Sequence, residues 1–278
     1  MRNADHQSRN REWWTKHTMS YDWNEKISSE RYTKNWFRES DLRFLHGARL
    51  FTGDANPFEK LMDLHSIAGK RVLEIGCGMG FHSELLARAG ARLTSIDISP
   101  TSVEATKRRL SLAGIEADVR ELDALEAGSL GEKFDLIWSW GVLHHSSHTA
   151  RAVRVCSSLL KPEGSLRLMA YHVGGMSAYV TLVRRYLSGF WRGRDLDDLL
   201  WQDADGFTAR FYTRDGFADM LGAHFSDVDV RVFGQDADVV PVPRQIRPPL
   251  LRLLSKEKQI KLAGERGSMI YADCRLPI

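Results

Sequence analysis

Three alternating glycines and two carboxylates near them could together bind a nucleoside. Gly76, Gly78 and Gly80 alternate in one short loop, Glu74 precedes them, and Asp97 follows at some distance. Glycines let a backbone turn tightly and approach a ligand closely. A carboxylate at the end of the next strand can accept hydrogen bonds from both hydroxyls of a ribose. These residue types in this order predict a nucleoside site.

The spacing of the glycines excludes two common nucleotide sites. The dinucleotide fingerprint needs glycine at its sixth position, which here is Phe81 when counted from Gly76 and Ser83 when counted from Gly78. A phosphate-binding P-loop needs a Gly-Lys-Ser/Thr sequence, and none follows these glycines. The charge of Glu74 would repel a pyrophosphate but suits an amino group and a sulfonium. The ligand indicated has a ribose, a positive charge and no phosphate, which describes S-adenosylmethionine.

The elements that must position these residues form a strand, a turn, a helix and a second strand. Residues 71–75 are an apolar run of strand length, and the helical pattern after the glycines ends at Gly90. Residues 92–96 form the second run, which ends on Asp97. This order is that of a nucleotide-binding βαβ half. Further strands are expected at 117–122, 134–139, 165–172, 227–232 and 268–274.

The pattern Glu74-x-Gly76-x-Gly78-x-Gly80, followed by Asp97, resembles the first two motifs of the class I S-adenosylmethionine-dependent methyltransferases. The resemblance covers roughly residues 58–172 and, more loosely, the chain from 211 onward. It implies an α/β fold with a seven-stranded Rossmann-like methyltransferase sheet, mostly parallel with an antiparallel last strand, plus N-terminal helices and a cap insertion. The expected divisions are an N-terminal aromatic helical cover at 1–56 and a methyltransferase domain at 57–278, with a cap insertion at 173–210 and a basic insertion at 234–267.

The resemblance also implies which residues contact the cofactor. In this family an acid just past the third strand commonly binds the adenine amino group. That role falls to Asp123, unless it is a loop carboxylate that faces water. The positions expected to bind S-adenosylmethionine are Glu74, Gly76, Gly78, Gly80, Asp97, Ile98, Asp123, Ala124 and Trp140.

Two adjacent histidines, His144 and His145, follow the fourth expected strand. Ligands of open α/β sheets bind beyond the carboxyl ends of the strands, so this loop is expected to face the same crevice as Asp97. A histidine with a pKa of about 6.5 could take the proton of an acceptor hydroxyl. We expect His145, which lies farther from the strand end, to be the catalytic base. The alternatives are that His144, hydrogen-bonded near the cofactor, is the catalytic histidine, or that both histidines only pack the loop and cap the helix after it.

Large aromatic side chains are concentrated ahead of the first core strand. After residues 1–10, which are polar and expected to be frayed, Tyr21 and Trp23 precede a helical pattern at 29–50. This segment is either a lid in which Tyr21 or Trp23 touches ligand, or an aromatic stripe that docks on the core. Methyltransferases of this class often cover the cofactor with N-terminal helices.

Two basic segments allow alternative interpretations. Four arginines of the cap insertion either line a pocket for an acidic substrate or form a solvated helix face: Arg184, Arg185, Arg192 and Arg194. The basic stretch 250–262 is expected to be an amphipathic helix. It either binds a membrane surface, an RNA backbone or a partner, or docks on the edge of the sheet with its cations in water.

Composition restricts the compartment and the partners. The 278 residues are 43% hydrophobic, with a net charge of +3, which is too small to imply a nucleic-acid partner. Three dispersed cysteines without metal-ligand spacing predict no metal site and a reducing compartment. The polar N-terminus predicts no signal peptide, and no apolar run reaches the about twenty residues of a transmembrane segment. A cytoplasmic protein is expected; its oligomeric state is not indicated.

The leading hypothesis is an enzyme that transfers a methyl group from S-adenosylmethionine to a small-molecule substrate. The two-histidine loop resembles enzymes that act on a hydroxyl oxygen of a secondary metabolite, quinone or sugar. One alternative is methylation of a nitrogen, or of RNA or protein, but the N/D-P-P-Y/F loop of amino-directed enzymes is missing after the fourth strand. Another is a non-catalytic S-adenosylmethionine-binding protein, but the glycines and Asp97 are intact.

Overall fold

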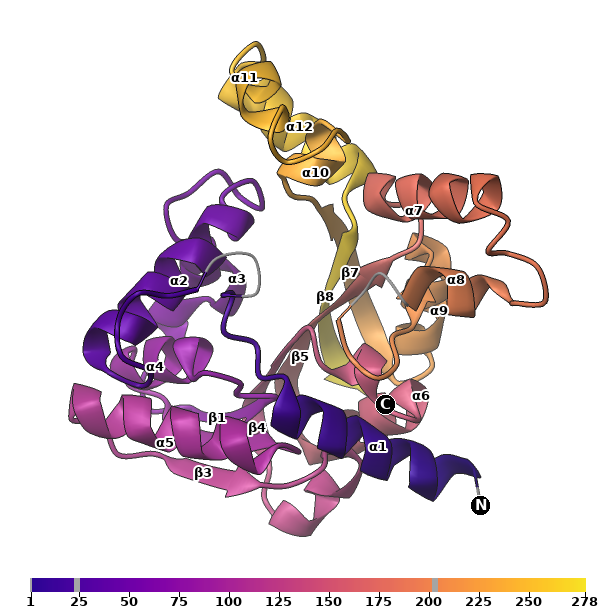
Figure 1. The fold of residues 1–278 in the computed structure, drawn as a ribbon. Helices are drawn as coiled ribbons and strands as arrows, with labels where there is room; N and C mark the ends of the chain where they lie inside the picture. Colours follow the sequence, from indigo (N-terminus) through magenta and orange to yellow (C-terminus); the bar gives the residue numbers. More distant parts are fainter. Residues whose placement is uncertain (1, 23–25, 202–204) are drawn as a thin grey trace.

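The computed structural model describes residues 2–22, 26–201 and 205–278. Its centre is an eight-stranded sheet with the order β3-β2-β1-β4-β5-β8-β7, in which a short β6 pairs with β5 outside this path (Figure 1). The strands are β1 Arg71–Ile75, β2 Arg92–Asp97, β3 Asp118–Glu121, β4 Phe134–Trp140, β5 Leu160–His172, β6 Phe211–Tyr212, β7 Phe225–Phe233 and β8 Met269–Pro277.

The pairing confirms the expected fold. β1 to β6 pair in parallel with their neighbours, and β8 runs antiparallel to both β5 and β7. The expected sheet had seven strands. The eighth, β6, consists of only two residues where the chain returns from the cap insertion, a length too short for its alternation to be visible in sequence.

Helices cover both faces of the sheet. They are α1 Arg2–Lys16, α2 Lys34–Ala48, α3 Phe58–Met62, α4 Phe81–Arg88, α5 Pro100–Ala113, α6 Thr149–Leu159, α7 Met176–Leu187, α8 Leu196–Trp201, α9 Arg214–Gly222, α10 Asp236–Val239, α11 Arg247–Leu251 and α12 Lys256–Arg266. Three 3-10 helices add η1 Leu64–Ser66, η2 Ala124–Leu130 and η3 Leu143–His145. None of the helices in the described ranges is both long and apolar enough to cross a bilayer.

Two apolar clusters form the main core. One joins the sheet to α6 and α9, and Phe217 and Cys156 are fully buried in it. The other joins the opposite face to α2, α3 and α4 around Phe58 and Trp138, which are also fully buried. A sheet covered on both faces needs apolar strands rather than alternating ones, which is why the central strands read as continuous apolar runs.

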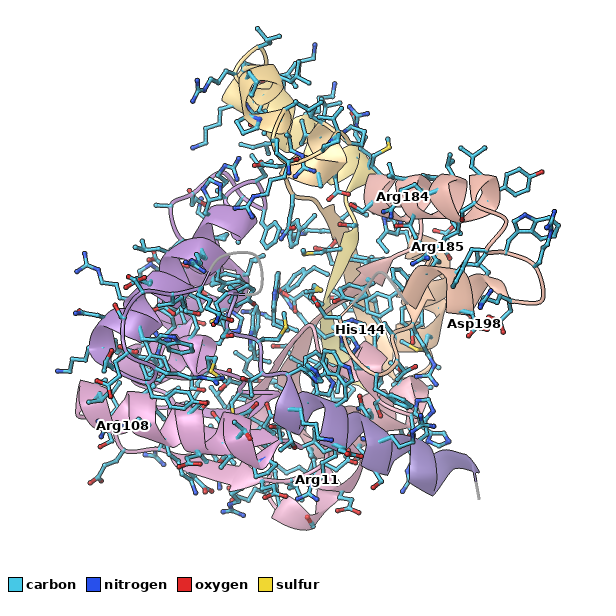
Figure 2. All side chains as sticks on the ribbon, in the orientation of Figure 1. Arg11, Arg108, His144, Arg184, Arg185 and Asp198 are labelled. Carbon is cyan, nitrogen blue, oxygen red and sulfur yellow. The ribbon has the colours of Figure 1, made fainter. Side chains whose placement is uncertain are left out.

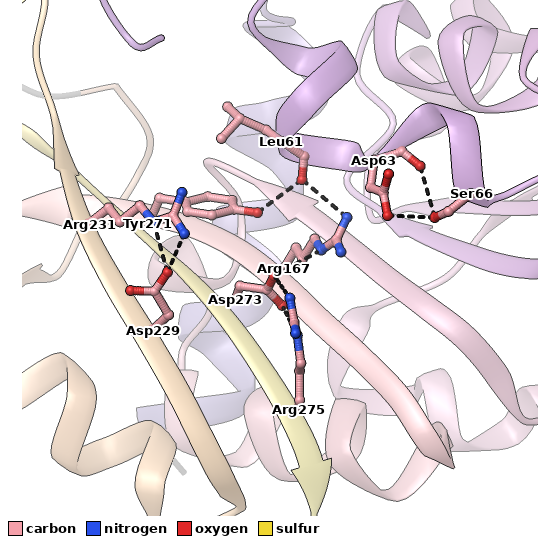
Figure 3. A network of polar contacts seen from close by, with 9 residues as sticks. All are labelled: Leu61, Asp63, Ser66, Arg167, Asp229, Arg231, Tyr271, Asp273 and Arg275. Carbon is pink, nitrogen blue, oxygen red and sulfur yellow. Dashed lines mark hydrogen bonds and ion pairs between the residues drawn. The ribbon is translucent and has the colours of Figure 1, made fainter.

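A polar network attaches α3 to the antiparallel side of the sheet (Figure 3). The Leu61 carbonyl accepts hydrogen bonds from the Tyr271 hydroxyl at 3.0 Å and from Arg167 at 3.3 Å. Asp273 of β8 forms ion pairs with Arg167 of the neighbouring strand β5 and with Arg275 of its own strand. These bonds satisfy a helix-end carbonyl that has no partner within α3.

Two expectations about local structure are wrong. Residues 1–10 were expected to be frayed, but α1 spans Arg2–Lys16 and is held by side-chain bonds to distant loops. The basic stretch 250–262 was expected to be one helix. It is instead divided between α11 and α12, because Ser255 caps the N-terminus of α12 by accepting a hydrogen bond from the Lys258 N–H.

Arg109 connects α2 to α4 and α5. Its guanidinium donates two 2.8 Å bonds to Asp41 of α2 and one 2.7 Å bond to Glu84 of α4. Its side chain is only 7% exposed. Asp41 depends on this buried cation, whereas Glu84 is also paired with Arg88 at 2.8 Å. Arg108, next to it on α5, is exposed on the outer side of the molecule (Figure 2).

Arg109→Met should therefore destabilise the protein strongly. It leaves Asp41 and Glu84 partly buried without their shared partner, which costs about 3–5 kcal/mol. The matched control Arg108→Met should change the free energy of unfolding by less than about 0.5 kcal/mol. Urea unfolding measures both variants, and equal effects of the two substitutions would show that the network does not attach α2.

Candidate active site

One cavity of about 600 Å³ lies beyond the carboxyl ends of β1, β2 and β4. This is where open α/β sheets bind their ligands. Of the predicted cofactor and catalytic positions, the cavity is lined by Gly76, Gly78, Asp97, Ile98, Asp123, Ala124, Trp140 and His145. Glu74, Gly80 and His144 do not line it.

The glycine loop forms the wall of the cavity at the carboxyl end of β1. Gly76 has a φ of +84°, and a Cβ there would lie 2.1 Å from a methyl group of Val142. Gly80 has a φ of +75° and packs against Thr106 of α5, where a Cβ would meet the backbone at 3.2 Å. A Cβ at Gly78 would meet nothing within 4 Å, so this glycine leaves open space toward a ligand.

Asp97 holds the loop and offers acceptors to a ligand. Its Oδ2 accepts the Gly78 N–H at 3.0 Å, and its Oδ1 accepts the Ser99 N–H at 2.8 Å. Burial raises the pKa of Asp97 to about 6, although these two backbone bonds act against that rise. A carboxylate oxygen has two lone pairs, so each oxygen keeps one acceptor position for a ribose hydroxyl.

Glu74 is placed differently from the expectation. It lies beneath the loop, 1% exposed, and accepts hydrogen bonds from the hydroxyls of Ser83 and Ser95. Burial raises its pKa to about 7, and the two serine bonds lower it. Glu74 therefore connects β1, α4 and β2 and does not present a fixed charge to the cavity.

The helix α1 closes the cavity over η2. The Gln7 amide donates to Asp123 Oδ2 at 2.8 Å, and its carbonyl accepts the Ser147 N–H at 2.9 Å. Asp123 also caps η2 by accepting the Leu125 N–H at 2.9 Å. Asn10, one turn further along α1, is 3% exposed and lines the cavity, and its Oδ1 has no partner among the described residues.

A buried histidine provides a donor on the opposite wall. His82 Nδ1 accepts the indole N–H of Trp138 at 3.1 Å, which places the ring proton on Nε2. This Nε2 has no hydrogen-bond partner in the described part of the chain, although His82 lines the cavity. Burial lowers the pKa of His82 to about 3, so the ring is neutral.

His145 is held in one tautomer. Its Nδ1 lies 2.6 Å from the Thr208 carbonyl, which can only accept, so Nδ1 carries the proton and Nε2 keeps its lone pair. The indole ring of Trp14 from α1 packs edge-on at 5.1 Å. Burial lowers the pKa of His145 to about 4, and the Thr208 carbonyl acts against this. The ring is therefore a neutral acceptor at any physiological pH.

His144 lies behind His145. It is fully buried, and its ring lies 4.1 Å from the His145 ring and 4.3 Å from the Tyr171 ring, between centroids (Figure 2). The two histidine rings pack against each other at an interplanar angle of 40°, and only His145 lines the cavity. Burial moves the pKa of His144 far below its usual range, and the neighbouring His145 and Arg210 lower it further.

The loop from Asp205 to Arg210 supports both histidines. A Cβ at Gly206 would lie 2.6 Å from His145 Nδ1, so only glycine fits there without displacing the ring. Arg210 donates its backbone N–H to the His144 carbonyl at 3.0 Å and its guanidinium to the carbonyls of Ser146 and Ser147. This loop fixes the position of η3.

Hydroxyl and carboxyl groups surround the end of the cavity near His145. Tyr21 lines it and stacks on Phe44 at 5.0 Å. Burial, and then the nearby carboxylate of Asp205, raise the pKa values of Tyr21 and Tyr171. Burial also raises the pKa of Asp205 itself. The expected lid residue Tyr21 is thus placed in the cavity wall, whereas Trp23 lies outside the described residues.

Several cavity residues were missed by sequence reasoning. They come from α1, from α4 and β5, and from the loop before β6: Gln7, Asn10, Trp14, His82, Tyr171 and Asp205. Gln7, Asn10 and Trp14 lie on one face of α1, and this face lines the cavity. Their i, i+3, i+7 spacing is the sequence pattern from which this face could have been predicted.

The central part of the chain is similar to known proteins. Residues 72–164 match the family described as "Methyltransferase domain". The sequence is 35% identical over 134 residues to a ubiquinone biosynthesis O-methyltransferase of Stutzerimonas stutzeri, covering 47% of this chain and 55% of that protein. It is 33% identical over 156 residues to the protein of the same name from Nitrosococcus oceani, covering 53% and 61%. The chain thus spans little more than half the length of these relatives.

A solved structure has the same fold over the whole chain. Magnesium protoporphyrin IX methyltransferase from Synechocystis PCC 6803 with bound S-adenosylhomocysteine superimposes with a TM-score of 0.57. The superposition covers 98% of this chain and 100% of that chain at 17% sequence identity. Residues 72–164 are thus similar to methyltransferase domains, and the chain has the fold of a methyltransferase that was solved with S-adenosylhomocysteine bound.

Proposed function

We propose that this protein binds S-adenosylmethionine and transfers its methyl group to a hydroxyl oxygen of a small molecule. The observation that carries the proposal is one continuous cavity that joins the Asp97 carboxylate to His145. The Asp97 carboxylate suits a ribose. His145 is a neutral base whose ring proton is held on Nδ1 by the Thr208 carbonyl, so that Nε2 can accept a proton.

The cavity fits the cofactor along its length. Asp97 would accept the ribose hydroxyls, and Ile98 and Ala124 would contact the adenine beside Asp123. The unpartnered Nε2–H of His82 is a donor for the carboxylate of the methionine portion. The open space at Gly78 admits the ligand against the loop backbone. When bound, S-adenosylmethionine supplies an electrophilic methyl group.

The remaining chemistry falls to residues of this chain. His145 Nε2 would accept the hydroxyl proton of the acceptor, and the Thr208 carbonyl would stabilise the imidazolium that results. Trp14 and α1 cover the His145 side of the cavity and exclude water. Tyr171 and Asp205 would orient the acceptor through its other polar groups. Alignment of the acceptor can contribute about 7–11 kcal/mol.

An oxygen acceptor is supported by the relatives, both of which are named as O-methyltransferases. The apolar wall formed by Phe44, Phe51, Trp140 and Met169 suits a ring or an alkyl chain. We therefore assign the acceptor to hydroxylated aromatic or quinol-like molecules in preference to sugars. A nitrogen acceptor is less well supported, because the sequence after β4 lacks the N/D-P-P-Y/F loop of amino-directed enzymes.

Cofactor affinity should depend on pH through Asp97. Its carboxylate form accepts the ribose hydroxyls, and it takes up a proton as the pH falls through about 6. The dissociation constant of S-adenosylhomocysteine should therefore rise about tenfold per pH unit below that value. In Asp97→Asn this pH dependence should disappear and binding should be weaker throughout.

Titration calorimetry between acid and neutral pH measures this dependence. Glu74→Gln is the matched control, because Glu74 also has a raised pKa but lies outside the cavity; it should keep the pH dependence. An affinity that Asp97→Asn leaves unchanged would refute the ribose assignment.

The role of His145 is tested by His145→Gln. Loss of a general base lowers the rate of methyl transfer by about 10²–10⁴, whereas the affinity for S-adenosylhomocysteine should stay within about twofold of the native value because His145 lies outside the Asp97 end. The assay follows S-adenosylhomocysteine release with a panel of phenolic, quinol and sugar acceptors. His144→Gln serves as the neighbouring control. A His145→Gln enzyme that keeps its rate on every accepted substrate leaves positioning as the whole mechanism.

A further inference from the structure

The segment 240–256, called the tip below, contains two leucine pairs that its own core only half uses. Leu251 is 6% exposed and packs with Leu50, Val239 and Ala263. Leu254 is partly buried against the same cluster. Leu250 and Leu253, each next to one of these buried leucines in sequence, face outward and are 39% and 80% exposed. Ile246 is also 53% exposed, so three large apolar side chains of the tip face solvent.

The charges of the tip all have one sign. Residues 240–256 contain four basic residues and no Asp or Glu. Arg247 is used internally, because its guanidinium donates to the carbonyls of Val240 and Val242. Arg244 and Arg252 are exposed and flank the outward leucines. The outer face of the tip is therefore both apolar and cationic.

The tip projects beyond the end of the β7–β8 pair, with α11 at its far end (Figure 1). Helix α10, which precedes the tip, is hydrogen-bonded to α7 of the cap insertion. Asp238 of α10 is fully buried and accepts hydrogen bonds from the Ser177 N–H and hydroxyl of α7, at 3.3 and 3.0 Å. α7 in turn lines the cavity with Ala178 and Thr181. The position of the tip is thus coupled to one wall of the cavity.

Exposed aromatic side chains lie on α7 and in the turn after it. Tyr179 and Tyr186 of α7 are 56% and 68% exposed, and Trp191, beyond the end of α7, is 43% exposed and stacks on Tyr186 at 5.8 Å. Exposed Tyr and Trp are typical of the boundary between headgroups and acyl chains. The apolar residues of α7 and of the tip thus lie on two neighbouring elements that are connected through Asp238.

We propose that the tip docks on an anionic lipid surface, with Leu250 and Leu253 entering the headgroup boundary and Arg244 and Arg252 pairing with lipid phosphates. Amphipathic segments with outward leucines and flanking cations bind such surfaces, and their cations act additively within a Debye length. If the proposed function holds, this docking places the cavity next to the bilayer and favours an amphiphilic acceptor.

Two other occupants fit the tip less well. Single-stranded nucleic acids are bound on aromatic side chains, and residues 240–256 contain none. A second copy of the chain would bring two cationic tips together, and their like charges would repel. An anionic bilayer offers an apolar environment to the leucines and negatively charged phosphates to the arginines.

Vesicle co-sedimentation of the full chain tests the proposal. The protein should bind vesicles of phosphatidylcholine with phosphatidylglycerol, release them as salt is raised, and ignore phosphatidylcholine alone. Leu250→Ser with Leu253→Ser should weaken binding about tenfold or more. Arg244→Glu with Arg252→Glu should weaken it about 25-fold or more, at about fivefold per basic side chain.

Matched controls lie on helices outside the tip. Leu42→Ser, at a leucine 59% exposed on α2, and Arg108→Glu on α5 should leave vesicle binding unchanged. Calorimetry with S-adenosylhomocysteine should give the same affinity for every variant, which shows that each one folds. Failure of the native protein to bind this ligand would sink the proposed function and not the docking.

Three outcomes would overturn the docking proposal. One is that the native protein ignores anionic vesicles. Another is that the control and tip variants bind equally. The third is that a single-stranded RNA oligomer, or self-association in sedimentation, depends on the tip while vesicle binding does not.

Discussion

The buried carboxylate of Asp97 is the interaction on which the site depends. It accepts N–H groups from Gly78 of the glycine loop and from Ser99 at the start of α5. The Ser99 hydroxyl caps α5 through the Ser102 N–H and lies 3.3 Å from the Trp14 carbonyl of α1. One ionisable side chain at the end of β2 therefore fixes the loop, a helix N-terminus and the covering helix relative to each other.

The sequence predicted those parts of the site that are carried by short, local patterns. The glycines at 76, 78 and 80 and the acid at 97 have fixed distances along a βαβ unit, so their spacing determines where they meet. The same holds for the fold, because a sheet buried on both faces gives continuous apolar runs. The antiparallel β8 was visible as the last of two strongly alternating segments.

The rest of the site depends on contacts between segments far apart in sequence. Glu74 turns inward because Ser83 and Ser95 meet it there, and no local pattern records that meeting. Gln7 belongs to a polar helix whose stability comes from the loops it touches. The tautomer of His145 is set by the Thr208 carbonyl, 63 residues away. Burial lowers the pKa of His145 to about 4. The neighbouring residues in the sequence do not reveal how deeply the ring is buried.

The account's central claim is that Asp97 and the glycine loop hold the ribose of an S-adenosyl ligand. A crystal structure of the protein with S-adenosylhomocysteine tests this claim most directly. Both ribose hydroxyls should donate to the Asp97 carboxylate, with the adenine beside Asp123 and the sulfur on the side of the cavity that leads to His145. A ligand bound elsewhere in the cavity, with Asp97 contacting only the N–H groups of Gly78 and Ser99, would contradict it.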